Sequence, residues 1–199
     1  MEPRWLTDNN IERLSKVKKL CNHFHLSVQS LSNSVLKRMN RKYTREYLFD
    51  ITQKIRDKFE DVTFTCDIIV GYIDETDEEF LETLEGVKKI RFSDIHVFKF
   101  SKRSHTRAYN LDSSVDGNVA LKRSEELIEL GNKLKIEVLN KYLGQNIKVL
   151  FEEYKDGYLY GYTSNYIKVK VKGDKNLWGK IQELKLISLE KDLILGQIK

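Results

Sequence analysis

Cysteine and proline are both scarce in this chain of 199 residues, which has two cysteines and a single proline. Cys21 and Cys66 are too few for a disulfide framework or a four-cysteine metal site, and they fit a reducing, cytoplasmic setting. No apolar run approaches the length of a transmembrane helix, and the N-terminus lacks the pattern of a secretory signal peptide. We therefore expect no membrane partner.

Charged residues are plentiful by contrast. They make up 33% of the chain and hydrophobic residues 40%, a balance that excludes extended disorder and allows a buried core. The formal net charge is +5. A basic excess of this size permits a polyanionic partner without requiring one.

The first hundred residues alternate between helical and extended patterns. Helices are predicted over 7–20, 43–59 and 76–90, with a short helical segment at 32–40, and strands over 23–30, 62–71 and 94–100. Thr7 and Thr44 are the expected N-caps, while Thr76 and Glu79 have the spacing of a capping box. In the first helix, Ile11, Leu14 and Val17 should share the buried face, with Leu20 as a further candidate. This order is typical of a parallel α/β sheet, and three strands are too few for a TIM-type barrel, which needs about eight.

Towards the C-terminus, the spacing of the hydrophobic residues changes from helical to alternating. A long helix is expected over 118–142, with Gly144 ending it, and about four or five short strands follow. They predict a small antiparallel β-barrel or sheet. We place the domain boundary so that residues 1–143 form the partial barrel with its linking helix and residues 144–199 form the small barrel.

Four blocks of the sequence resemble the radical-SAM tRNA methylthiotransferases. They are HFHLSVQSLSNSVLKRMNRKYT, DIIVGYIDETDEEFLETL, FSDIHVFKFSKRSHT and YLGQNIKVLFEEYKDGYLYGYTSNYIKVKVKGDKNLWGKI, and in this order they cover nearly all of the chain. HFHLS together with SDIHVF is most similar to the MtaB branch, which implies 2-methylthiolation of N6-threonylcarbamoyladenosine beside the anticodon. The resemblance implies the C-terminal half of a radical-SAM barrel, followed by a TRAM domain, a small tRNA-binding β-barrel.

The resemblance also implies two cofactors, S-adenosylmethionine and 4Fe-4S clusters. The family binds the barrel cluster through a CxxxCxxC motif, to which neither cysteine of this chain belongs. We therefore expect no catalytic residue and no metal ligand here, and no turnover by this chain alone. The cofactor-binding candidates are strand-end and loop residues that could reach adenosine, ribose or the methionine carboxylate: Gln29, Ser30, Arg38, Ile69 and Gly71.

The chain departs from the family at turn positions. The family usually reads QSGS, GFPGE and PYSxREGT, where this chain has QSLS at 29–32, GYIDE at 71–75, and Lys99 and His105 in place of the proline and the glycine. Glycine permits positive φ and proline presets a bend, so these losses should strain or loosen the cofactor-side loops. A truncated gene, a false start and a decayed remnant all stay open, as does a missing N-terminal half supplied by another chain.

The stretch GYLYGYTSNYIKVKVKG, residues 157–173, places tyrosines and then lysines at alternate positions. Alternate side chains of a strand share one face, so a row of rings and a row of ammonium groups are expected. Rings stack on unpaired bases and ammonium groups follow a phosphate backbone, although the tyrosines could also simply fill a barrel face while the lysines keep an edge strand soluble. The TRAM resemblance favours RNA, with a tRNA anticodon stem-loop as partner. The residues assigned to this contact are Tyr160, Tyr166, Lys168, Lys170 and Lys172.

Histidines and acids give weaker signals. His23 and His25 share a strand face, but no further ligands converge on them in the sequence, so packed histidines are favoured over a metal site. Helix-dipole complementarity explains the acids of 74–79 without Mg²⁺. Glu2 resembles a strand-end acid of the family, and its terminal position predicts fraying.

Two hypotheses of different classes follow. The chain is either a fragment of a tRNA methylthiotransferase, inactive alone, or a stand-alone tRNA-binding remnant without catalysis. Without the resemblance, half of a generic α/β barrel with a β appendage would remain.

Overall fold

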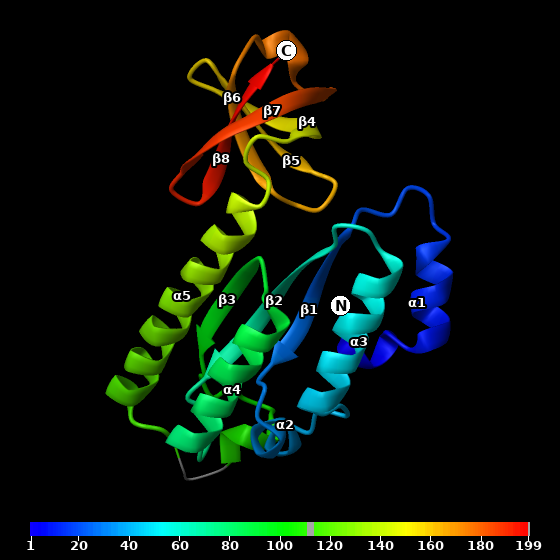
Figure 1. The fold of residues 1–199 in the computed structure, drawn as a ribbon. Coiled ribbons are helices and arrows are strands. Elements are labelled where there is room, and N and C mark those ends of the chain that lie inside the picture. The colour runs from blue at the N-terminus through cyan, green and yellow to red at the C-terminus, as the bar shows by residue number, and fades with distance from the viewer. Residues whose placement is uncertain (111–113, 199) are drawn as a thin grey trace.

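The computed structural model describes residues 1–110 and 114–198. A three-stranded sheet flanked by helices is followed by a long helix and a closed five-stranded barrel (Figure 1). The first part contains η1 (Pro3–Trp5), α1 (Asp8–Ser15), β1 (His23–Gln29), α2 (Asn33–Arg38), α3 (Arg45–Lys58), β2 (Thr63–Val70), α4 (Asp77–Ile90), β3 (Asp94–Lys99) and η2 (Arg107–Asn110). The second contains α5 (Gly117–Asn140), β4 (Asn146–Lys155), β5 (Tyr158–Thr163), β6 (Lys168–Lys172), η3 (Lys175–Leu177), β7 (Ile181–Glu190) and β8 (Leu193–Ile198). Within the described ranges, no helix combines the length and the apolarity that a membrane span requires.

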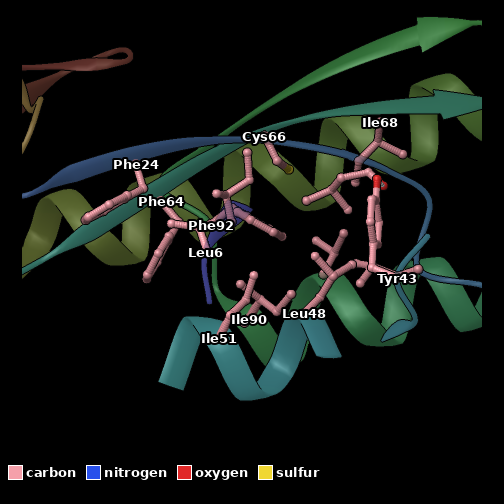
Figure 2. Close-up of a cluster of buried hydrophobic side chains, with 14 of the residues drawn as sticks. Leu6, Phe24, Tyr43, Leu48, Ile51, Phe64, Cys66, Ile68, Ile90 and Phe92 are labelled. Atoms are coloured by element: carbon pink, nitrogen blue, oxygen red, sulfur yellow. Dashed lines mark hydrogen bonds between the residues drawn. The ribbon is translucent and has the colours of Figure 1, made fainter. Parts of the chain in front are cut away.

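The sheet is parallel in the order β1-β2-β3, as the alternating pattern predicts. Its strands carry apolar side chains on the face that α3 and α4 cover, where Phe24, Phe64 and Ile51 belong to the buried core (Figure 2). The same core receives Leu127 and Leu134 from α5, which lies along β3. The opposite face of the sheet carries polar side chains, and this face holds most of the candidate site.

Helix starts follow the predicted caps. The side chains of Thr7, Thr44 and Thr76 each accept a hydrogen bond from a backbone N–H of the first turn, and Thr76 and Glu79 form the complete capping box. The end of the first helix was predicted wrongly. It stops at Ser15, and Val17 is 51% exposed, because residues 16–20 turn back so that Leu20, not Val17, packs against the core.

The N-terminus is not frayed, contrary to the expectation for Glu2. The amino group of Met1 donates to the carbonyl of His25 at 2.6 Å, and Ser27 N–H donates to the Met1 carbonyl at 2.9 Å. Glu2 accepts a hydrogen bond from Arg41 at 3.0 Å. The first residue therefore satisfies part of the otherwise open edge of β1, which fixes its place.

The C-terminal barrel closes in the order β4-β5-β6-β8-β7. It is not wholly antiparallel as expected, because β6 and β8 pair in parallel. A closed ring of five strands cannot alternate in direction all the way round, so one parallel pair is unavoidable. Val138, Leu139 and Tyr142, at and just beyond the end of α5, pack into the barrel core and join the two parts.

Asn165 makes the polar contacts between the barrel and the first part of the chain. Its side-chain amide donates to the carboxylate of Asp61 and to the hydroxyl of Tyr142, both at 2.9 Å. The backbone carbonyl of Asn165 accepts a hydrogen bond from Thr63 Oγ1 at 2.6 Å. Asn165 is only 3% exposed, so these bonds are made out of water and hold the turn between β5 and β6 against the start of β2.

Candidate functional site

A cavity of about 640 Å³ opens beside the C-terminal ends of the three parallel strands. Ligands of parallel α/β folds bind at this end of the strands. Its cationic and aromatic side chains come from β3, from the loops after β2 and β3, and from the segment after α2. The lining includes Gln29, Arg41, Asp67, Ile69, Tyr72, Phe98, Lys99, Phe100 and Arg103.

Two of the five predicted cofactor residues, Gln29 and Ile69, meet in this cavity. Gln29 has φ +65°, a left-handed conformation that is uncommon for residues other than glycine. This conformation coincides with the irregular register between β1 and β2, where Gln29 pairs with Ile68. The backbone at the strand end is therefore bent where the cavity begins.

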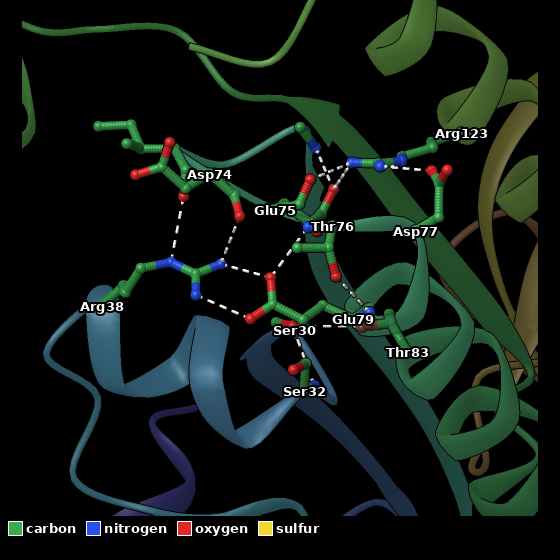
Figure 3. Close-up of polar contacts among 12 residues, drawn as sticks. Ser30, Ser32, Arg38, Asp74, Glu75, Thr76, Asp77, Glu79, Thr83 and Arg123 are labelled. Carbon is green, nitrogen blue, oxygen red and sulfur yellow. Dashed lines mark hydrogen bonds and ion pairs between the residues drawn. The ribbon is translucent and has the colours of Figure 1, made fainter. Parts of the chain in front are cut away.

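Ser30 and Gly71 do not line the same cavity; they support the loops around it. Ser30 is fully buried, and its hydroxyl is 3.2 Å from the Thr83 hydroxyl and accepts from Ser32 N–H (Figure 3). Gly71 has φ +69°, and a Cβ there would lie 2.7 Å from the Cβ of Ala120. Glycine therefore allows α5 to approach the end of β2.

Arg38 is held by protein groups. Its guanidinium donates to Glu79 Oε1 at 2.7 Å and to the carbonyls of Ile73 and Asp74 (Figure 3). The hydrogen bond from Arg38 is the main cause that lowers the pKa of Glu79. Arg41, three residues after Arg38, lines the cavity instead. The sequence pattern predicts Arg38 and not Arg41 for this role.

The loop between β2 and α4 is fixed by a buried ion pair. Arg123 of α5 donates to the carboxylate of Glu75 at 2.8 Å and to Asp77 at 2.7 Å (Figure 3). Glu75 also accepts from Gly71 N–H at 2.7 Å. Burial raises the pKa of Glu75, while Gly71 N–H and Arg123 act against that rise. Glu75 and Asp77 thus make their contacts within the protein.

On the outer surface of the barrel, the tyrosines of β5 lie directly beside the lysines of β6. The cross-strand pairs are Tyr158 with Lys172, Tyr160 with Lys170, and Tyr162 with Lys168. We call these six residues the Tyr–Lys face. Their neighbours on each strand, such as Leu159 and Val169, are buried in the barrel core, so the alternation predicted from the sequence is confirmed.

One lysine of this face already has an acidic partner. Lys170 Nζ donates to Glu190 at 2.7 Å and lies 4.6 Å from the centroid of the Tyr158 ring. The hydrogen bond to Glu190 is the main cause that raises the pKa of Lys170. Lys172 is exposed and Lys168 is partly exposed.

Tyr166 continues the face towards the sheet. Its ring stacks on Tyr162, with centroids 4.5 Å apart, and on His23 of β1, with centroids 4.6 Å apart. Burial, with a smaller effect of nearby His25, lowers the pKa of His23 to about 4, so at neutral pH its ring is uncharged. This aromatic column borders a second cavity of about 600 Å³, which Lys168 also lines.

Sequence reasoning missed one cluster on the polar face of the sheet. Asp67 of β2 lies between two histidines, with Oδ2 3.1 Å from His25 Nε2 and Oδ1 3.2 Å from His96 Nδ1. The only signal in the sequence was a single carboxylate inside the apolar strand CDIIV. His25 and His96 line the 600 Å³ cavity and Asp67 lines the 640 Å³ cavity, so the cluster stands between the two.

Comparison with known proteins identifies relatives over nearly the whole chain. Residues 3–87 match the radical SAM superfamily. Threonylcarbamoyladenosine tRNA methylthiotransferase MtaB of Bacillus subtilis is 39% identical over 192 residues, which cover 94% of this chain and 43% of that protein. tRNA-2-methylthio-N(6)-dimethylallyladenosine synthase of Aquifex aeolicus is 38% identical over 197 residues, 96% of this chain and 45% of that protein. The chain is a relative of the radical-SAM tRNA methylthiotransferases.

The chain spans less than half the length of the curated methylthiotransferases that it matches. Two solved structures share its fold at low identity. Coproporphyrinogen III oxidase of Escherichia coli, a radical SAM enzyme, has a TM-score of 0.57 and 21% identity over 67% of this chain and 31% of its own. The archaeal Methanocaldococcus infernus Elp3 has a TM-score of 0.51 and 13% identity, and covers all of this chain with 60% of its own. The sequence relatives confirm the resemblance to tRNA methylthiotransferases, and the two solved structures show a shared fold.

Proposed function

We propose that these 199 residues are part of a tRNA methylthiotransferase and that they supply its S-adenosylmethionine cavity and a tRNA contact. The reaction would be 2-methylthiolation of N6-threonylcarbamoyladenosine next to the anticodon. The observation that carries the proposal is the identity of 36–41% to tRNA methylthiolating enzymes over 92–98% of this chain. The choice between modified adenosines rests on the MtaB-like sequence blocks, because dimethylallyladenosine-type relatives are as similar as MtaB.

The Tyr–Lys face supports a role in tRNA binding. Aromatic rings give stacking surfaces for unpaired bases, and lysines beside them neutralise the phosphates between those bases. An anticodon stem-loop offers both features. We propose a TRAM-like domain over residues 144–199 for this contact, with Lys168 and Lys172 on phosphates, Lys170 beside them, and Tyr160 under a base. Tyr166, the other stacking candidate, would take a base only by leaving its stack between Tyr162 and His23.

The 640 Å³ cavity supports a role in holding S-adenosylmethionine. Arg41, Lys99 and Arg103 on its wall suit the methionine carboxylate, and the aromatic rings of Tyr72, Phe98 and Phe100 suit the adenine. Gln29 and Ile69 would contact the adenosine part. Bound in this cavity, S-adenosylmethionine would supply the radical chemistry needed at C2 of the adenosine, while these residues would hold and orient it.

The cysteines of this chain do not fit a 4Fe-4S cluster. Cys66 is wholly buried on the helix-covered side of the sheet, and burial raises the pKa of its thiol. Cys21 is exposed before β1. Two cysteines placed in this way cannot provide the three thiolates of a CxxxCxxC site, so we expect no methylthiolation by the purified 199-residue chain.

Binding of a tRNA anticodon stem-loop tests the RNA contact. We expect affinity that falls with salt, with a slope of about −0.7 to −0.9 in log K against log[salt] for each phosphate contact. The double variant Lys168→Ala/Lys172→Ala should lose about 1.4–1.8 units of that slope. The control Lys148→Ala/Lys185→Ala removes the same charge from β4 and β7 and should leave the slope close to wild type. Equal slopes for the two double variants would show that the Tyr–Lys face is not the contact.

Binding of S-adenosylmethionine separates the two hypotheses of function. A methylthiotransferase fragment should bind it, and Arg41→Met should weaken binding by about tenfold or more, as expected for loss of a charge-assisted hydrogen bond. Lys42→Met is the matched control, since Lys42 is exposed and not on the cavity wall. A chain that binds tRNA but not S-adenosylmethionine is instead the stand-alone RNA-binding remnant.

A further inference from the structure

We propose that His25, Asp67 and His96 form a binding site for a divalent transition-metal ion on the polar face of the sheet. The three residues come from β1, β2 and β3, one from each strand. One ligand atom from each, two imidazole nitrogens and a carboxylate oxygen, lies within 4.8 Å of the other two. Atoms so spaced need only small side-chain rotations to reach the 2.0–2.2 Å bonds of zinc.

The strand register creates this convergence. Asp67 pairs directly with His96 across the β2–β3 ladder, and His25 lies opposite Thr65, two residues before Asp67. Residues two apart on a strand share a face, so Asp67 points to the same side as both histidines. The rigid backbone of three paired strands therefore holds the donor atoms in place before any ion arrives.

The hydroxyl of Thr65 orients His25, the less exposed of the two histidines. Thr65 Oγ1 lies 2.9 Å from His25 Nδ1, while His25 Nε2 faces Asp67. Without an ion, Nε2–H donates to the Asp67 carboxylate and Nδ1 accepts from the Thr65 hydroxyl. A bound metal would replace the Nε2 proton, and the same hydroxyl would then accept from Nδ1–H. Metal-ligating histidines usually have such a hydrogen-bond partner on the second nitrogen, because it sets the tautomer and the ring orientation.

The ligand set selects the class of metal. Two imidazoles and a single carboxylate suit zinc, iron, cobalt or nickel, whereas calcium and magnesium require mostly oxygen ligands. Lys135, which lines the 600 Å³ cavity together with Lys168, is paired with Asp94 at 2.8 Å, so its charge is partly compensated. The side chain of His96 is 55% exposed, which gives the ion a path from solvent and leaves coordination positions open to water.

The test is metal binding by the whole 199-residue chain without a polyhistidine tag. Zn²⁺ is titrated in competition with a chromogenic chelator, and Co²⁺ is added to record its visible absorption bands. Both are measured on Cys21→Ser protein, because Cys21 is an exposed thiol and could bind these metals itself. We expect one equivalent of Zn²⁺ and a Co²⁺ spectrum typical of mixed nitrogen and oxygen ligands.

Two variants test whether the ion binds at this cluster. His96→Ala should weaken Zn²⁺ binding by about tenfold or more, since loss of even an outer-shell partner costs about 10–100-fold. His105→Ala removes an exposed histidine in the loop after β3 and should change the affinity by less than about twofold. Matching circular dichroism spectra would confirm that both variants are folded, which the exposure of His96 favours. Absence of stoichiometric binding, or equal affinities for the two variants, would overturn the proposal and leave a hydrogen-bonded cluster without a metal.

Discussion

Replacing Gly161 with alanine should damage the barrel more than any other glycine substitution in the 157–173 hairpin. Gly161 lies in β5 opposite Phe151, at the place where the register between β4 and β5 shifts. A Cβ on Gly161 would lie 2.0 Å from the carbonyl oxygen of Leu150. Carbon–oxygen contacts between neighbouring strands are about 3.3–3.6 Å, so the two backbones would have to separate by more than about 1 Å.

That separation has a predictable energetic cost. Moving β4 away breaks about two or three ladder hydrogen bonds, each contributing about 0.5–1.5 kcal/mol. It also disturbs Phe151, which is fully buried in the barrel core. Together these losses amount to about 3–5 kcal/mol in the free energy of unfolding.

Gly157→Ala is the matched control in the same hairpin. Gly157 has φ +81° and nothing within 4 Å of its added Cβ, so alanine there meets only the strain of a left-handed backbone, about 1–2 kcal/mol. Urea unfolding followed by far-ultraviolet circular dichroism measures both variants. The steric argument is refuted if Gly161→Ala is no less stable than Gly157→Ala.

Two further predictions concern contacts between distant segments. Asn165→Ala removes the hydrogen bonds to the Asp61 carboxylate and the Tyr142 hydroxyl and should lower the free energy of unfolding by about 2–3 kcal/mol, measured by urea titration; a loss below about 0.5 kcal/mol would show that water replaces them. Arg38→Met removes the partner that lowers the pKa of Glu79. A lowered pKa stabilises the fold above the unfolded value of about 4.3, and this is lost as pH falls through the folded value. The variant should therefore lose more stability at pH 7 than in strong acid, where only the lost hydrogen bonds to the Ile73 and Asp74 carbonyls still count. An unfolding difference that does not vary with pH would contradict the assignment.

Local patterns were sufficient to predict most of the elements. Helix caps at Thr7, Thr44 and Thr76 depend on atoms three residues apart, and the strand order follows from alternation with helices. The end of α1 could not be found in this way, because Val17 and Leu20 fit a helical stripe equally well. Which of them is buried depends on where β1 and α3 lie, and that is a tertiary property.

The site depended on contacts between segments far apart in the chain. Arg38 and Arg41 are equivalent in the sequence as cations after β1. Glu79, 41 residues from Arg38, engages the first, whereas Arg41 pairs with Glu2 and lines the cavity. In the same way, the role of Asp67 appears only when the parallel register brings it beside His96. Periodicity within one strand contains no information about register with the next.

The arrangement of the two cavities limits how a bound tRNA could use them. The aromatic column of Tyr162, Tyr166 and His23 stands at the N-terminal end of β1, whereas Gln29 in the 640 Å³ cavity stands at its C-terminal end. Six residue steps along a strand span about 20 Å. One nucleotide cannot cover that distance, so under the proposed function a base stacked on the column and the target adenosine brought to S-adenosylmethionine would be different nucleotides. The polar face of the sheet, with His25 and Asp67 midway, would lie along the path between them.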